Sequence, residues 1–295
     1  NSLASSTRRI SPQIAAPDTL EATTTASALV RHRQELRRGL RASVMEGILA
    51  MPIVTMSLPV NVFLTTLVTK GLPLSKPDVG GITAAPFACN FLQVFFSPLI
   101  TRRAPVKATA IVSAGLHALT WFWLAWRLPS LVAEPLPDAA RTLVIWFFVS
   151  SVFNALLAVV WNIWMHDLVP ARLRGRYFGQ RNRAAQASTL VFVLLTGWVL
   201  AKGGYSARIF QWVIGVSAAI RLVSLYFFWL QPASRPSGQH ADQEPPQPLL
   251  QQVRVLAGSH SLLLFIAFGA LWSFATNCFG PFYHVFLYEQ LGLSG

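Results

Sequence analysis

The chain has 295 residues, of which 53% are hydrophobic and only 12% are charged, whereas soluble domains have a charged share of about a quarter. This composition excludes an ordinary water-soluble globule and favours helices in lipid, which are apolar on all sides for about 20 residues. The net charge of +13 does not indicate a nucleic-acid partner, because the Lys and Arg residues lie mainly in short segments between long apolar runs, as in membrane proteins.

The chain begins with a polar tail, and its first apolar run contains prolines. Residues 1–40 are expected to be a disordered cytoplasmic tail, because their start is rich in Ser, Thr and Ala and lacks the apolar core of a cleaved signal. The first span is predicted over residues 43–69 and contains Glu46, Pro52 and Pro59. Because neighbouring helices satisfy the carbonyls that a proline frees, this span is predicted to be a kinked helix inside a bundle.

Five further apolar runs complete a predicted six-helix bundle over residues 41–230. They are predicted to span the membrane over residues 79–100, 108–126, 142–165, 184–201 and 209–230. Residues 231–256 are rich in Pro, Gln and Ser, which indicates a flexible, solvated cytoplasmic linker.

A seventh span is predicted over residues 261–287, within a segment 257–295 that would begin a second bundle. Because the chain stops soon after this apolar run, we expect it to be a fragment. The predicted fold class is an all-α membrane protein, with a six-helix bundle followed by a linker and one further helix.

The positions of the basic residues predict the orientation of the chain. The segments on the same side of the membrane as the N-terminus hold 15 Lys and Arg residues, against six on the opposite side. By the positive-inside rule, the N-terminus lies in the cytoplasm. We therefore expect a multi-pass protein of the cytoplasmic, or inner, membrane.

The loop after the fourth span has a specific pattern. Residues 166–179 read HDLVPARLRGRYFG, in which Pro170 ends the helix and Gly175 and Gly179 permit close approach of neighbouring helices. It resembles the loop between helices four and five of the major facilitator superfamily, where an acid, a proline and an Arg-Gly pair followed by a later glycine recur. The resemblance covers about residues 40–295 and implies two six-helix halves, related as parallel repeats, that transport a solute by alternating access.

The resemblance also implies a cytoplasmic latch that holds one state of such a transporter closed. Its predicted members are Arg102, Arg103, Asp167, Arg172, Arg174 and Arg176. The chain departs from the family between the second and third spans, where Thr101 stands at the place expected for an acid. The fourth and fifth spans also lack the Arg and the Gly-Pro motif of the family's proton-coupled antiporters, which disfavours multidrug export by proton antiport.

Two ionisable residues lie inside predicted spans, where a charge costs about 2.5–3.5 kcal/mol, and each is therefore a candidate functional residue. Arg221 lies about 15 Å from the nearer end of its span at ~1.5 Å per residue, and Glu46 lies a few residues inside its own. Either the two side chains pair within the bundle, or each extends separately into a wet crevice at the cytoplasmic face.

Uncharged polar residues in the spans are the predicted substrate ligands. By the resemblance, helices one, four and seven line the central cavity. In the first span these residues recur every four positions, so an undistorted helix would place them on one stripe. The predicted ligands are Ser57, Asn61, Thr65, Asn90, Gln93, Asn154, Trp161 and Asn277.

Amides beside tryptophan suit a neutral hydroxylated solute, because amides both donate and accept hydrogen bonds while the indole packs on apolar ring faces. The alternative is that these polar residues only hydrogen-bond between helices. Trp121, Trp123 and Trp126 are predicted to form an aromatic belt at the membrane surface.

No enzymatic or cofactor site is predicted. The six histidines are scattered without paired metal-ligand spacing, and no phosphate-binding loop is present. The expected partners are the lipid bilayer and a small-molecule solute, with or without a coupling ion, and the protein is expected to be monomeric. The main alternative is a seven-helix receptor or sensor without transport activity, and a membrane-embedded enzyme would need clustered His, Asp or Glu at one membrane face.

Overall fold

The computed structural model describes residues 18–59, 61–103, 105–233 and 258–289. In this part of the chain every regular element is a helix. The elements are α1 (Asp18–Met56), α2 (Val62–Thr66), the π-helix η1 (Leu67–Gly71), α3 (Lys76–Arg103), α4 (Val106–Ala133), α5 (Leu136–Leu168), the 3-10 helix η2 (Ala171–Leu173), α6 (Arg174–Lys202), α7 (Ala207–Leu230) and α9 (His260–Glu289).

Five helical segments among the described residues are long and apolar enough to cross a membrane. They are Gln34–Met56, Val106–Ala133, Leu136–Leu168, Ala171–Lys202 and Ala207–Leu230. Helices α3 and α9, with 28 and 30 residues, stand where the second and seventh spans are predicted. The prediction of an all-α, multi-pass membrane protein is therefore confirmed.

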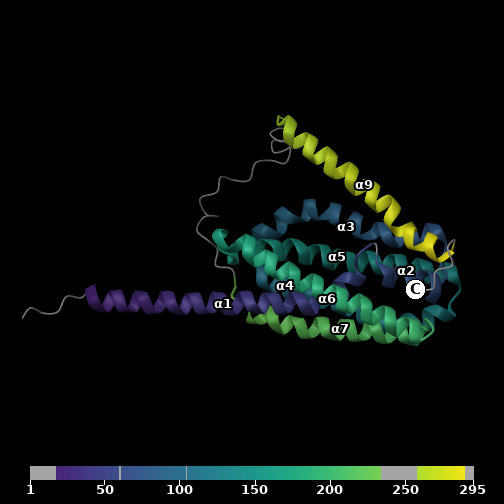
Figure 1. The fold of residues 1–295 in the computed structure, drawn as a ribbon, viewed down its shortest axis with the longest axis horizontal. Coiled ribbons are helices and arrows are strands. Elements are labelled where there is room, and N and C mark those ends of the chain that lie inside the picture. Colours follow the sequence, from purple (N-terminus) through teal and green to yellow (C-terminus); the bar gives the residue numbers. More distant parts are fainter. Residues whose placement is uncertain (1–17, 60, 104, 234–257, 290–295) are drawn as a thin grey trace, which may run out of the picture.

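The long helices pack side by side into a bundle (Figure 1). Helix α4 packs against α5 and α7, α3 packs against α5, and α1 packs against both α6 and α7. The first part of α1 extends well beyond the bundle, while α9 lies apart from it on one side (Figure 1) and contacts it at α2. Nearly all the described side chains of α9 are exposed.

The first predicted span differs from the observed structure at both ends. Helix α1 begins at Asp18, so residues 18–40 are helical rather than the expected disordered tail. The segment before Ser43 is rich in Ala, Leu and Arg, which all have high helix propensity. Pro52 lies inside α1, but the helix stops at Met56, because Pro59 has no amide hydrogen and disfavours helical geometry in the residue before it.

The interior of the bundle contains two apolar clusters with buried polar residues between them. Along α4, Ala114 belongs to the smaller cluster and Trp121 to the larger, and His117 lies between them. Along α7, Arg221 and Ser224 lie between Ala218 of the larger cluster and Phe228 of the smaller. Together with Glu46 of α1, the buried residues His117, Arg221 and Ser224 form what we call the polar layer.

The end of α7 is held in place where α5 passes into α6, at residues 168–174. At this end of the bundle, Lys107 Nζ of α4 donates hydrogen bonds to the carbonyl oxygens of Trp229, at 2.7 Å, and Gln231, at 2.6 Å. Trp164 Nε1 of α5 donates to the carbonyl oxygen of Pro232 at 3.1 Å. A positive charge stabilises a helix C-terminus, so these contacts hold the end of α7 against α4 and α5.

Candidate functional site

A charged network joins three helices within the polar layer. Glu46 of α1 accepts a hydrogen bond from Arg221 Nη1 of α7 at 2.7 Å, and its second oxygen accepts one from Arg181 Nη2 of α6 at 3.3 Å. Arg221 Nη1 also donates to Ser224 Oγ at 3.1 Å. Glu46 and Arg221 are only 2% and 1% exposed, so their charges depend on each other for stabilisation rather than on water.

An aromatic ring lies at each end of the network. The Arg181 guanidinium carbon is 4.0 Å from the ring centre of Trp161 on α5, and that of Arg221 is 5.5 Å from the ring centre of Phe228. Such cation–π contacts stabilise a charge that has left water. A Cβ on Gly47 would lie 3.1 Å from a terminal nitrogen of Arg181, so the glycine leaves room for this side chain. We call Glu46, Arg181, Arg221, Trp161 and Phe228 the charged network.

Three N–H groups of the charged network have no hydrogen-bond partner among the described residues. They are Nε of Arg181, Nε of Arg221 and the indole Nε1 of Trp161, and all three atoms are buried. Buried donors are paired in most proteins, so an unpaired donor calls for an explanation. The two on Arg181 and Trp161 belong to side chains that stack on each other.

The sequence identified Glu46 and Arg221 as candidates but missed Arg181. The contact of 2.7 Å between Glu46 and Arg221 corresponds to the pairing that the sequence left open as one of two alternatives. Arg181 lies close to the loop basic residues in sequence, yet α6 already begins at Arg174, which places Arg181 about two turns inside a helix. The available signal was that Arg181, Ala185 and Ser188 recur at helical spacing, which continues the inner face of α6.

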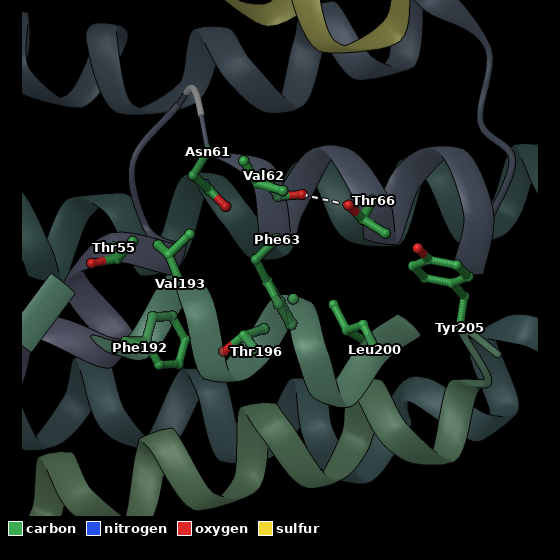
Figure 2. Close-up of a pocket in the computed structure, with 11 residues that line it drawn as sticks. Thr55, Asn61, Val62, Phe63, Thr66, Phe192, Val193, Thr196, Leu200 and Tyr205 are labelled. Atoms are coloured by element: carbon green, nitrogen blue, oxygen red, sulfur yellow. Dashed lines mark hydrogen bonds between the residues drawn. The ribbon is translucent and has the colours of Figure 1, made fainter. Parts of the chain in front are cut away.

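A second polar region surrounds the break between α1 and α2. A cavity of about 60 Å³ lies between these helices and α6, and Figure 2 shows the side chains around it. The residues that line it include Thr55, Thr66, Thr196 and Tyr205, together with apolar side chains such as Phe63 and Phe192. A space of this size accommodates a few water molecules or one small polar group.

Two of the predicted ligands in the first span, together with Thr66, make hydrogen bonds to nearby backbone. Ser57 Oγ donates to the carbonyl oxygen of Ile53 at 2.7 Å, and Thr65 Oγ1 to that of Asn61 at 3.0 Å. Thr66 Oγ1 donates to the carbonyl oxygen of Val62 at 2.7 Å, which is the dashed line in Figure 2. Because α1 stops at Met56, Ser57, Asn61 and Thr65 do not form the stripe of one undistorted helix.

The amide of Asn61 stabilises the break itself. Its Nδ2 donates to the carbonyl oxygens of Met56, at 3.1 Å, and Leu58, at 2.6 Å, while its Oδ1 accepts from the Leu64 amide at 2.7 Å. Asn61 therefore caps the start of α2 and also satisfies carbonyls freed at the end of α1.

His117 was missed by the sequence analysis. It is fully buried, its Nε2 lies 3.1 Å from Ser57 Oγ, and the same nitrogen accepts from Trp121 Nε1 at 3.1 Å. Trp121 is 1% exposed, so its assignment to an aromatic belt is wrong, whereas Trp123 and Trp126 are exposed as such a belt requires. Trp121 is turned inward because it packs edge-on against Trp146 of α5.

The remaining predicted ligands lie in separate places. Asn90 is exposed on α3, and Asn154 is half-buried on α5. Gln93 lines an otherwise mainly apolar cavity of about 270 Å³ between α3 and α5, away from the cavity that Asn61 lines. The side chain of Asn277 lies outside the described residues.

Four of the six predicted latch residues, Asp167, Arg172, Arg174 and Arg176, lie around the connection between α5 and α6. Arg174 donates to the carbonyl oxygens of His166, at 2.9 Å, and Val169, at 3.1 Å, and so caps the end of α5. Asp167 Oδ1 lies 3.8 Å from His166 Nδ1, and Arg172 and Arg176 are exposed. The side chains of Arg102 and Arg103 lie outside the described residues.

The described part of the chain has no group of three His, Cys, Asp or Glu side chains placed to hold a metal ion. A sequence model of the Major Facilitator Superfamily matches residues 47–295. No curated protein and no solved structure matches the chain. The family match includes Arg181, Arg221 and the whole of α2 to α9, and it begins one residue after Glu46.

Proposed function

The chain belongs to the major facilitator superfamily, a family of membrane transporters, and from this premise we propose that it is a secondary active transporter that moves a small organic solute by alternating access. Its partners are then the lipid bilayer around the helices and the solute within the bundle. Six helices, α1 with α2, α3, α4, α5, α6 and α7, form one half of the transporter in this proposal. Helix α9 begins the other half, after the linker.

The observation that carries the proposal is the broken first helix beside a cavity whose lining includes three threonines and a tyrosine among apolar side chains. Transporters place solute and ion sites at discontinuous helices, because the break exposes backbone groups and end dipoles inside the membrane. The interruption between Met56 and Val62 and the cavity of about 60 Å³ that it borders match this arrangement. The Thr66 hydroxyl, which now donates to the carbonyl oxygen of Val62 one turn away, can turn toward a solute with little loss.

The latch residues support the alternating part of the proposal. Arg174 caps α5 and fixes the course of the connection to α6, while Arg172 and Arg176 are exposed beside it. Exposed guanidinium groups at this position are free to pair with acidic groups or helix C-termini of a second bundle. The excess of basic residues on the same side as the N-terminus supports a cytoplasmic position for this face in the proposal.

Transport by the purified protein in sealed liposomes tests the proposal. A panel of labelled sugars, nucleosides, amino acids and organic acids is supplied in turn, with protein-free liposomes as the blank. We expect uptake or efflux of at least one solute, and we expect Thr196→Val to reduce it, because Thr196 lines the cavity. Thr109→Val is the matched control, since the Thr109 hydroxyl donates to the carbonyl oxygen of Pro105 just before α4, away from the cavity.

A receptor or sensor is the competing function. It would bind a solute, detected as a rise in unfolding temperature, without moving any member of the panel in either direction. That result with a correctly folded, monodisperse sample would contradict the transport proposal.

A further inference from the structure

The charged network contains more positive than negative charge. Among the described residues, Glu46 is the only carboxylate that contacts either Arg181 or Arg221. One acid therefore faces two guanidinium groups, and both are always protonated in proteins. An uncompensated charge at this depth is costly and is by default a functional-site candidate. The network lacks one negative charge.

The two arginines differ in how firmly they are held. Arg221 makes the shorter contact with Glu46, donates a second bond to Ser224 and is 1% exposed. The side chain of Arg181 makes the longer contact, at 3.3 Å, and remains 17% exposed. Glu46 is therefore mainly the partner of Arg221, and the charge that lacks a counter-ion is that of Arg181.

Unpaired donors lie beside the same uncompensated charge. Nε of Arg181 and Nε1 of Trp161 are buried without hydrogen-bond partners among the described residues, and the two side chains stack at 4.0 Å. An oxyanion would supply the missing charge and also the acceptor lone pairs, because guanidinium groups bind carboxylate and phosphate oxygens through paired N–H donors. A neutral hydroxylated solute would supply only the acceptors.

We infer, on the basis of the proposed transport function, that the transported solute is an organic anion and that Arg181, together with the indole N–H of Trp161, binds its carboxylate or phosphate group. Glu46 then stays on Arg221, so the loaded network has two acids for two arginines. In the unloaded state Glu46 bridges both arginines. This substrate class replaces the neutral solute that the amide residues indicate, since the amide of Asn61 is already used to cap α2.

The test compares anions with their neutral counterparts in uptake by the full chain in liposomes. The labelled pairs are benzoate and benzamide, succinate and succinamide, and glycerol phosphate and glycerol. We expect the wild type to take up an anion at least about tenfold faster than its neutral partner, because only the anion makes a charge-assisted hydrogen bond to Arg181. Arg181→Gln should abolish this preference, while Arg181→Lys should retain part of it.

Two further variants separate recognition from folding. Arg183→Gln removes the same charge from an exposed position two residues along α6, and it should leave uptake within about twofold of the wild type, as expected for a surface change. Trp161→Phe keeps the ring beside Arg181 but removes the indole N–H, and it should lower anion uptake several-fold. If Arg181→Gln does not fold, the anion preference of Trp161→Phe and of Arg181→Lys tests the inference in its place.

The outcomes also separate this inference from the transport proposal. Uptake of neutral members at the rate of the anions, or equal anion uptake by Arg181→Gln and Arg183→Gln, overturns the anion inference and leaves transport standing. If the wild type moves no member of the panel, the transport proposal is contradicted, and the unfolding temperature then tests anion binding by the network alone. An unfolding temperature that rises with benzoate, succinate or glycerol phosphate in the wild type, but not in Arg181→Gln, supports anion binding. An unfolding temperature that rises with anionic lipid only overturns the anion inference.

Discussion

The charged network and the break between α1 and α2 satisfy their polar groups in opposite ways. In the network, each contact of Glu46 crosses to a different helix, to Arg221 on α7 and to Arg181 on α6. At the break, Thr65 and Thr66 donate to carbonyl oxygens one turn earlier in the same segment. Interhelical contacts determine how the bundle is assembled, whereas local ones can be exchanged for contacts with a solute without moving a helix.

The two regions also differ in what removal of one group leaves behind. Removing Glu46 would leave the buried guanidinium group of Arg221 and the partly exposed one of Arg181 without their acid, and a buried charge without a partner is strongly destabilising. Removing the hydroxyl of a threonine at the break leaves the carbonyl oxygen to which it donated, and that oxygen still accepts a backbone hydrogen bond of the helix. Changes in the network should therefore lower stability as well as affect the binding of the solute's charged group, whereas changes at the break should affect the handling of solute with little effect on stability.

The largest expected effect comes from Glu46. The substitution Glu46→Gln should lower the free energy of unfolding by about 3–5 kcal/mol, the typical cost of breaking a buried ion pair. Unfolding of the purified protein in detergent measures this loss. The double variant Glu46→Gln, Arg221→Met should lose less unfolding free energy than the sum of the losses of the two single variants. The reason is that it leaves no arginine at position 221 in need of an acid. Additive losses would show that the pair is not coupled.

The next effect distinguishes an inward-facing from a lipid-facing tryptophan on one helix. Trp121→Ala should cost about 3–5 kcal/mol, as for other buried aromatic side chains, because Trp121 packs against Trp146 and donates to His117. Trp126→Ala, at a position that is 72% exposed, should change stability by less than about 0.5 kcal/mol. Equal losses for the two variants would mean that α4 is rotated relative to its described packing.

The smallest effect on stability is expected at the break. Thr66→Val should change the free energy of unfolding by less than about 1 kcal/mol, in line with the modest worth of side-chain hydrogen bonds in membranes. Uptake into liposomes should nevertheless fall, because Thr66 lines the cavity beside α6. Unchanged uptake together with unchanged stability would remove this cavity from the transport path.

Predictions from the sequence were most successful where apolar length decides the structure. Each of the helices α3, α4, α5, α6, α7 and α9 contains the range predicted for its span. The family match confirms the resemblance that the loop over residues 166–179 indicated. The first span was predicted as one kinked helix, and the chain instead breaks at Ser57 to Asn61. Local sequence marks a proline but does not reveal whether neighbours support a kink or whether an asparagine caps a new helix.

The candidate site was predicted only in part. Glu46 and Arg221 stood out because each is a charge in an apolar run. Arg181 lies among loop arginines in the sequence, and Trp121 lies among other tryptophans, so neither could be assigned to the interior by composition. Their roles depend on the rotation of α6 against α1 and of α4 against α5, and rotation about a helix axis is determined by packing rather than by hydropathy.

The amino-acid sequence alone determined that this protein is a bundle of membrane-spanning helices, because the burial of apolar side chains in lipid and the internal pairing of backbone groups depend on residue type and run length. Only the tertiary structure decided which charges meet. Glu46, Arg181 and Arg221 come from three helices far apart in the chain, and a pairing between distant segments depends on how the helices turn and cross.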